Sequence, residues 1–145
     1  MKKLFFLLIL ILPIQIFATS VERIDELGFN KLLKQGQSKT VVIFWGVYCP
    51  YCKELLKTVN ENKDFFNGQN IKVIAVSVDN DKKLVDNYAE KSNYYFKLYF
   101  DMGKLKRKYN AYFIPMTVIF DKNGGIEDTF PGNKTIYQLK ELLKD

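Results

Sequence analysis

Residues 40–53 read TVVIFWGVYCPYCK and carry the strongest indication of the fold. Thr40 to Trp45 is an unbroken run of β-branched and aromatic residues, which predicts a central strand buried on both faces. From Pro50 to about Phe66 the apolar residues recur at helical spacing, which predicts a helix. Both cysteines, Cys49 and Cys52, therefore lie where a buried strand gives way to a helix.

The spacing of the two cysteines predicts redox chemistry. Cys49 falls at the N-cap of the expected helix, and Pro50 falls at the first helical position, which proline prefers. The free N–H groups and the positive end of the helix dipole stabilise the Cys49 thiolate and so lower the pKa of its thiol. Cys52 lies one turn later, close enough to bond Cys49. We expect Cys49 to attack a substrate disulfide and Cys52 to resolve the mixed disulfide; the reverse order would oxidise a dithiol.

Three other interpretations of the cysteine pair compete with redox chemistry: a structural disulfide, a zinc site and a coincidental spacing. A bridge across two intervening residues constrains the unfolded chain very little. A zinc site usually has four ligands, and this chain of 145 residues has two cysteines and no histidine. The lack of histidine also excludes imidazole catalysis. We therefore expect a redox-active disulfide, no metal site and no cofactor.

The N-terminus has the pattern of a secretory signal peptide. Two lysines precede the apolar run of residues 4–12, a proline interrupts it, and Ala18 precedes the expected cut. The nine apolar residues are fewer than the ~20 that span a bilayer. We expect residues 1–18 to be a signal peptide, residues 19–145 to form one domain, and the protein to act in the periplasm or extracytoplasmic space. A tether formed by an uncleaved signal is the alternative.

Composition and charge exclude some classes of protein. The chain is 48% hydrophobic and 15% aromatic, which is too apolar for a disordered chain. The formal net charge is +6, and the basic residues are densest at residues 104–108, KLKRK. We interpret this run as a solvated helix face, with docking on an acidic partner as the alternative. No nucleic-acid motif is present, and we expect no nucleic-acid partner.

The rest of the chain predicts alternating helices and strands. The expected helices are 21–34, one that begins after an Asp79-Asn80-Asp81 cap, 103–109 and 134–144; the expected strands are 71–78, 94–100, 116–120 and 126–130. Residues 121–125 predict a hairpin turn. This order predicts an α/β fold, a three-layer sandwich with a central mixed β-sheet flanked by helices.

The motifs resemble a known family. F-W-G-x-x-C-x-x-C-K at residues 44–53 resembles the active site of thioredoxin-fold proteins. Later segments are similar to one branch, the exported TlpA/ResA-like thiol-disulfide oxidoreductases: V-I-A-V-S-V-D at 73–79, F-D-x-G-x-L at 100–105, Tyr109 followed by I-P-x-T at 114–117, F-D-x-x-G at 120–124 with Ile126, and Gly132. The resemblance covers about residues 38–144 and implies a thioredoxin-like sandwich.

The resemblance also implies roles that the residues alone do not show. Pro115 resembles the cis-proline that faces the active-site cysteines, and the backbone of Ile114 would pair with an extended substrate chain. Trp45, Pro50 and Tyr51 would shape the site. The implied partners are protein substrates with disulfides or dithiols, apocytochrome c among them, and a membrane thiol transporter as electron donor.

Two positions, 43 and 55, depart from the family pattern. Ile43 stands where thioredoxin carries a buried aspartate, and Leu55 stands where ResA-like reductases carry a glutamate. Glu54 lies one residue earlier, about 100° away around the helix, and is interpreted as a surface acid. Proton transfer to the buried thiol is therefore left without an assigned acid.

These observations predict an extracytoplasmic thiol-disulfide oxidoreductase, and we expect a reductase because the Pro50-Tyr51 dipeptide lacks the histidine of the strongest oxidants. An oxidant with the same site is the first alternative. A thioredoxin-fold binding module with vestigial thiols is the second, motivated by an aromatic segment that we nevertheless expect to be core: Tyr94, Tyr95, Phe96 and Tyr99. A Cu(I) metallochaperone that uses both thiolates is the third.

Overall fold

The computed structural model describes residues 20–144, and the predicted signal peptide lies outside this range. Six strands form one mixed sheet in the order β1-β4-β3-β2-β5-β6. The strands are β1 (Glu22–Ile24), β2 (Thr40–Trp45), β3 (Lys72–Ser77), β4 (Lys97–Asp101), β5 (Met116–Phe120) and β6 (Ile126–Pro131). The helices are α1 (Glu26–Lys34), α2 (Pro50–Glu61), α3 (Lys63–Gly68), α4 (Lys82–Glu90), α5 (Lys104–Lys108) and α6 (Ile136–Leu142). None of the helices described is long and apolar enough to cross a membrane.

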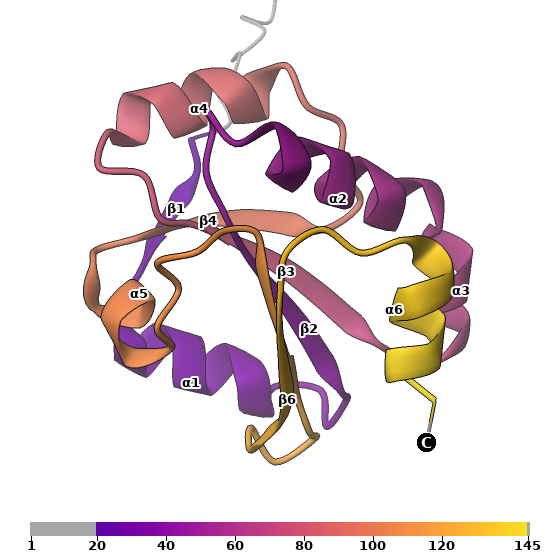
Figure 1. Ribbon diagram of the computed structural model, residues 1–145. Helices are drawn as coiled ribbons and strands as arrows, with labels where there is room; N and C mark the ends of the chain where they lie inside the picture. The colour runs from indigo at the N-terminus through magenta and orange to yellow at the C-terminus, as the bar shows by residue number, and fades with distance from the viewer. Residues whose placement is uncertain (1–19, 145) are drawn as a thin grey trace, which may run out of the picture.

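Helices cover both faces of the sheet (Figure 1). Leu56 of α2 and Val85 of α4 are buried with Ile43 in one core cluster, to which α3 and α6 also contribute. Phe29 of α1 and Phe44 of β2 belong to a second cluster on the opposite face, which includes the buried leucine of α5. The predicted three-layer α/β sandwich is therefore confirmed.

Strand β2 lies at the centre of the fold, as its composition predicts. It pairs in parallel with β3 and antiparallel with β5, and all six of its residues are buried. Successive side chains of a strand point to opposite faces, so Ile43 packs beneath α2 while Phe44 packs beneath α1. Because β2 and β3 are parallel, the residues that follow each strand meet at the same edge of the sheet.

Two predicted helices were wrong in part. The helix expected over Val21–Lys34 begins only at Glu26, because Asp25 caps it by accepting the Gly28 N–H at 2.8 Å, and Glu22–Ile24 instead pairs with β4. The helix expected from Pro50 to about Phe66 is divided between α2 and α3. Asn62 lies at the break, where its side-chain amide donates to the Thr58 carbonyl at 2.8 Å and its backbone leaves the helical conformation.

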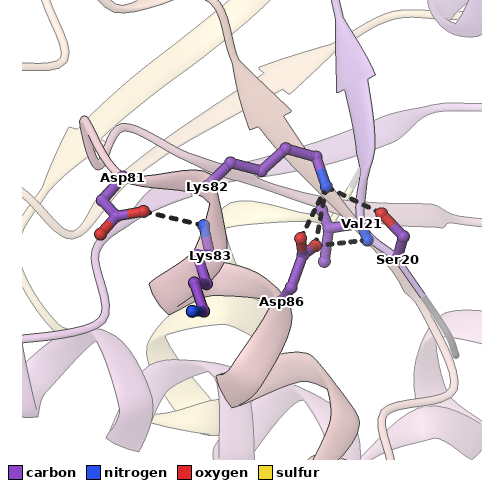
Figure 2. A network of polar contacts seen from close by, with 6 residues as sticks. All are labelled: Ser20, Val21, Asp81, Lys82, Lys83 and Asp86. Atoms are coloured by element: carbon purple, nitrogen blue, oxygen red, sulfur yellow. Dashed lines mark hydrogen bonds and ion pairs between the residues drawn. The ribbon is translucent and has the colours of Figure 1, made fainter.

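A set of polar contacts attaches the N-terminal segment to α4 (Figure 2). The Val21 N–H donates to Asp86 Oδ1 at 2.8 Å, and Lys82 Nζ donates to both Asp86 oxygens at 2.8 and 2.9 Å and to Ser20 Oγ at 2.8 Å. Burial raises the pKa of the Asp86 carboxyl, but the hydrogen bonds from Lys82 and Val21 outweigh it, so the pKa lies below its usual value. We call these four residues the N-terminal clasp.

Candidate active site

The predicted thiol pair lies at the start of α2, directly after β2. A disulfide joins Cys49 to Cys52 across a Cα–Cα distance of 5.2 Å. Cys49 is the N-cap residue of α2, Pro50 occupies the first helical turn, and the Cys52 N–H donates to Cys49 Sγ at 3.1 Å. Cys52 is fully buried, whereas Cys49 is half-buried. An incoming sulfur therefore reaches Cys49 first, at the point where the main chain favours negative charge.

The segment before β5 forms the opposite wall of the site. The Ile114–Pro115 peptide is cis, as the resemblance implies. The Ile114 carbonyl oxygen lies 3.8 Å from Cys49 Sγ. The Pro115 carbonyl accepts the Gly132 N–H at 2.8 Å, which ties this wall to the end of β6. Two segments that are distant in the sequence thus meet at one sulfur atom.

A carboxylate that the sequence analysis did not place in the site holds the turn between β2 and α2. The Val47 N–H donates to the Asp79 carboxylate at 3.0 and 3.3 Å, and the Ser77 hydroxyl donates to the same carboxylate at 2.7 Å. The sequence indicated Asp79 only as part of a helix cap and a family motif, whereas the N-cap of α4 is Asp81. A usable signal was present, since Asp79 follows the strand parallel to β2.

The predicted shaping residues lie around the disulfide in different environments. Trp45 is fully buried, and its ring lies 5.0 Å from that of Tyr88 in α4. Pro50 and Tyr51 are exposed. Four exposed aromatic side chains lie within three residues of Cys49 or Ile114 in the chain, and we call them the aromatic rim: Tyr48 (77% exposed), Tyr51 (65%), Tyr112 (56%) and Phe113 (83%).

The family positions that differ in this chain are apolar in the structure as well. Ile43 and Leu55 are fully buried in the core cluster beneath α2. Glu54 is exposed, in agreement with its interpretation as a surface acid. Neither Ile43 nor Leu55 can exchange a proton with Cys52.

The described residues bear on two of the alternative interpretations, the zinc site and the binding module. Within residues 20–144 no group of three or more His, Cys, Asp or Glu side chains could hold a metal ion. In the aromatic segment Phe96 and Tyr99 are buried, Tyr94 stacks on Phe96 with ring centroids 5.0 Å apart, and burial raises the pKa of the Tyr94 and Tyr95 phenols. The segment is therefore mostly core, as expected.

The basic run of residues 104–108 is mostly a solvated helix face. Leu105 is fully buried, whereas Lys104 and Arg107 are exposed. Lys108 forms an ion pair with Glu26 of α1, and Lys106 Nζ lies 5.7 Å from the centre of the Tyr112 ring. Two of the four basic residues of the run thus already have partners within the molecule.

Comparison with known proteins supports the resemblance. A family model described as the AhpC/TSA family matches residues 17–129. The thiol-disulfide oxidoreductase ResA of Geobacillus kaustophilus is 28% identical over 122 residues, which cover 83% of this chain and 70% of that protein. The sporulation thiol-disulfide oxidoreductase A of Bacillus subtilis is 29% identical over 115 residues, covering 77% and 69%. The crystal structure of StoA from Bacillus subtilis aligns with a TM-score of 0.66 at 27% identity, covering 74% of this chain and 84% of that one.

Proposed function

The chain belongs to the AhpC/TSA family, and on that premise we propose that it is a thiol-disulfide oxidoreductase that reduces the disulfides of protein substrates outside the cytoplasm. The observation that carries the proposal is the accessible Cys49 sulfur at the N-cap of α2, bonded to a buried Cys52. This asymmetry supports Cys49 as the nucleophile and Cys52 as the resolving thiol.

The reaction proceeds through two exchanges at sulfur. The Cys49 thiolate attacks one sulfur of the substrate disulfide, the substrate S–S bond breaks, and the released substrate sulfur takes up a proton. Cys52, once deprotonated, attacks Cys49 in the mixed disulfide, which releases the second substrate thiol and forms the Cys49–Cys52 disulfide. The substrate gains two electrons and two protons, and the protein dithiol loses them. A dithiol donor must then restore the reduced pair, and we assign that role to a membrane thiol transporter.

The walls of the site suit an extended polypeptide. The Ile114 backbone, whose carbonyl oxygen lies 3.8 Å from Cys49 Sγ, would pair with the substrate main chain. The aromatic rim would contact apolar side chains that flank the substrate cysteine. Both contacts require an unfolded or loosely folded substrate, because a compactly folded substrate could not place an extended segment beside the Ile114 backbone.

We infer the direction of electron flow from the residues beside the nucleophile. A strong oxidant needs a reduced form that is stabilised beyond the effect of the helix N-terminus. Pro50 and Tyr51 carry no cationic side chain that would add such stabilisation. This favours a reductase, and apocytochrome c, whose C-x-x-C-H cysteines attach haem, is a fitting substrate. The location outside the cytoplasm rests on the predicted signal peptide.

The test is turnover of a protein disulfide by the protein lacking residues 1–18, together with its reduction potential. We expect Cys49→Ser to abolish turnover, and we expect Cys52→Ser to trap a mixed disulfide between Cys49 and the substrate. A potential near or below about −220 mV supports the reductase, and a value near about −120 mV reverses the electron flow. Turnover that survives Cys49→Ser but not Cys52→Ser would contradict the assignment of the nucleophile.

A further inference from the structure

Asp79 follows β3, yet its carboxylate turns toward the loop that carries the nucleophile. Both carboxylate oxygens lie within hydrogen-bond distance of the Val47 N–H, at 3.0 and 3.3 Å. The Ser77 hydroxyl donates to one oxygen at 2.7 Å, and the Asp79 N–H returns to the Ser77 oxygen at 3.2 Å. The carboxylate is thus oriented by the last residue of its own strand and bonded to the loop that follows the neighbouring strand β2.

The turn held by Asp79 is confined on its other side as well. A methyl group added at Gly46 would lie 3.4 Å from Asp79 Oδ1 and 2.9 Å from Ile114 Cδ1. No side chain therefore fits at residue 46 between Asp79 and Ile114 without a shift. The Cys49 N–H donates to the Gly46 carbonyl at 3.2 Å, which closes the turn. Val47 thus lies inside a closed turn whose last residue is Cys49.

We propose that Asp79 is a positioning residue for Cys49: its carboxylate, oriented by Ser77, holds the Gly46–Cys49 turn through the Val47 N–H and so keeps the Cys49 sulfur on the Cys52 N–H. The inference rests on the proposed function of the dithiol. This positioning would affect the reactivity of Cys49. The Cys52 N–H lies 3.1 Å from Cys49 Sγ, and it would stabilise the thiolate only while the turn keeps the sulfur in place.

Helix capping does not account for the Asp79 carboxylate. Asp81 caps α4 by accepting the Lys83 N–H at 2.9 Å, and Asp79 lies before that cap. Lys53 and Glu54 on α2 are exposed and are the same in every variant. Loss of the Asp79 negative charge would by itself favour the Cys49 thiolate, and Asp79→Ala and Asp79→Asn lose the same charge. A slower reaction in Asp79→Ala than in Asp79→Asn therefore reports the turn rather than the charge.

The test measures how fast Cys49 reacts with iodoacetamide as a function of pH, in a Cys52→Ser background that retains the residue 52 main-chain N–H. Without an acceptor for Val47, Asp79→Ala is expected to raise the midpoint of the profile and slow the reaction about tenfold below it. Asp79→Asn retains an oxygen acceptor and is expected to stay within about twofold of the parent rate. Ser77→Ala, which removes one hydroxyl, is expected to slow the reaction about two- to threefold.

Asp101→Ala is the matched control. Asp101 is a buried carboxylate that accepts the Leu105 and Lys106 N–H groups at 3.1 and 2.8 Å, at the start of α5 rather than in the loop before Cys49. Its removal is expected to lower the melting temperature and leave the Cys49 profile unchanged.

Three results would overturn the positioning role: an unchanged profile in Asp79→Ala, a profile in Asp79→Asn as displaced as in Asp79→Ala, or an equal displacement in Asp101→Ala. If Asp79→Ala does not fold, an unchanged profile in Ser77→Ala overturns it. Alkylation of Cys49 requires no turnover. A protein that reduced no disulfide would therefore contradict the proposed function, but the alkylation profile would still test the positioning role of Asp79.

Discussion

Asp79 and Asp86 lie on either side of the start of α4 and use the same chemistry for different ends. Asp79 accepts the Val47 N–H at 3.0 Å beside the dithiol, and Asp86 accepts the Val21 N–H at 2.8 Å beside the N-terminal strand. The second donor differs, since Asp79 is oriented by the Ser77 hydroxyl whereas Asp86 is paired with the Lys82 ammonium (Figure 2). The same kind of bond thus holds the loop before Cys49 in one place and the N-terminal strand in the other.

The difference follows from what each carboxylate holds. The turn at Val47 continues β2, whose six residues are buried and which pairs with both β3 and β5, so we expect the strand to form without Asp79. Strand β1 has three residues, lies at the edge of the sheet and, within residues 20–144, pairs only with β4. It therefore depends on the N-terminal clasp. Loss of Asp79 should change reactivity, and loss of Asp86 should change stability.

The largest expected effect is a loss of unfolding free energy near the dithiol with no change in Cys49 reactivity. Phe44 is fully buried on the face opposite α2, in contact with the rings around Tyr109. Phe44→Ala is expected to lower the free energy of unfolding by about 3–5 kcal/mol, because it leaves a cavity in the core. Urea unfolding measures the loss, and the Cys49 alkylation profile of the still-folded protein should not move. A loss below about 1 kcal/mol would show that β2 is not the source of stability.

The next effect concerns the N-terminal clasp. Asp86→Ala removes the acceptor of the Val21 N–H and the partner of Lys82, whose side chain is only 16% exposed. We expect a loss of about 2 kcal/mol in unfolding free energy and faster hydrogen exchange at the Val21 amide. Asp81→Ala, which removes the cap of the same helix, is the control and should leave that amide protected. Equal exchange at Val21 in both variants would contradict the clasp.

The smallest effect is the acid dependence of the clasp. Because the pKa of the Asp86 carboxyl in the folded protein lies below its unfolded value of 3.8, the stability that it contributes is present above about pH 4 and is lost as the pH falls through the folded pKa. The difference in stability between the parent protein and Asp86→Asn should therefore shrink below about pH 4. Asp121, whose pKa is also lowered, is present in both proteins and cancels. A difference that grows on acidification would contradict the prediction.

Much of the site could be predicted because its determinants are local. The apolar run before Cys49, the proline after it and the three-residue spacing to Cys52 all act within a few residues along the chain. The cis Ile114–Pro115 peptide was inferred from the resemblance and is present. The burial of Leu55, which departs from the family pattern, was also predictable, because an apolar residue in an amphipathic helix faces the core.

Other features could not be predicted, because their partners lie far along the chain. Glu22–Ile24 has no strand pattern of its own and becomes β1 only by pairing with β4. The aromatic rim combines residues beside Cys49 with Tyr112 and Phe113, which the sequence analysis left without a role. The sequence predicted a helix cap within residues 79–81, and Asp81 is that cap, but the bond between Asp79 and the Val47 N–H was not predicted.

Residues 40–53 thus specify, without reference to the rest of the chain, a buried strand that delivers two cysteines to a helix N-terminus, since hydrophobic patterning and capping act over a single turn or strand. Only the folded sheet brings Asp79 to that turn and places Ile114 beside the Cys49 sulfur. The Val47 and Asp79 groups are 32 residues apart, and Cys49 and Ile114 are 65 apart. Such pairs meet only because the sheet places β3 on one side of β2 and β5 on the other.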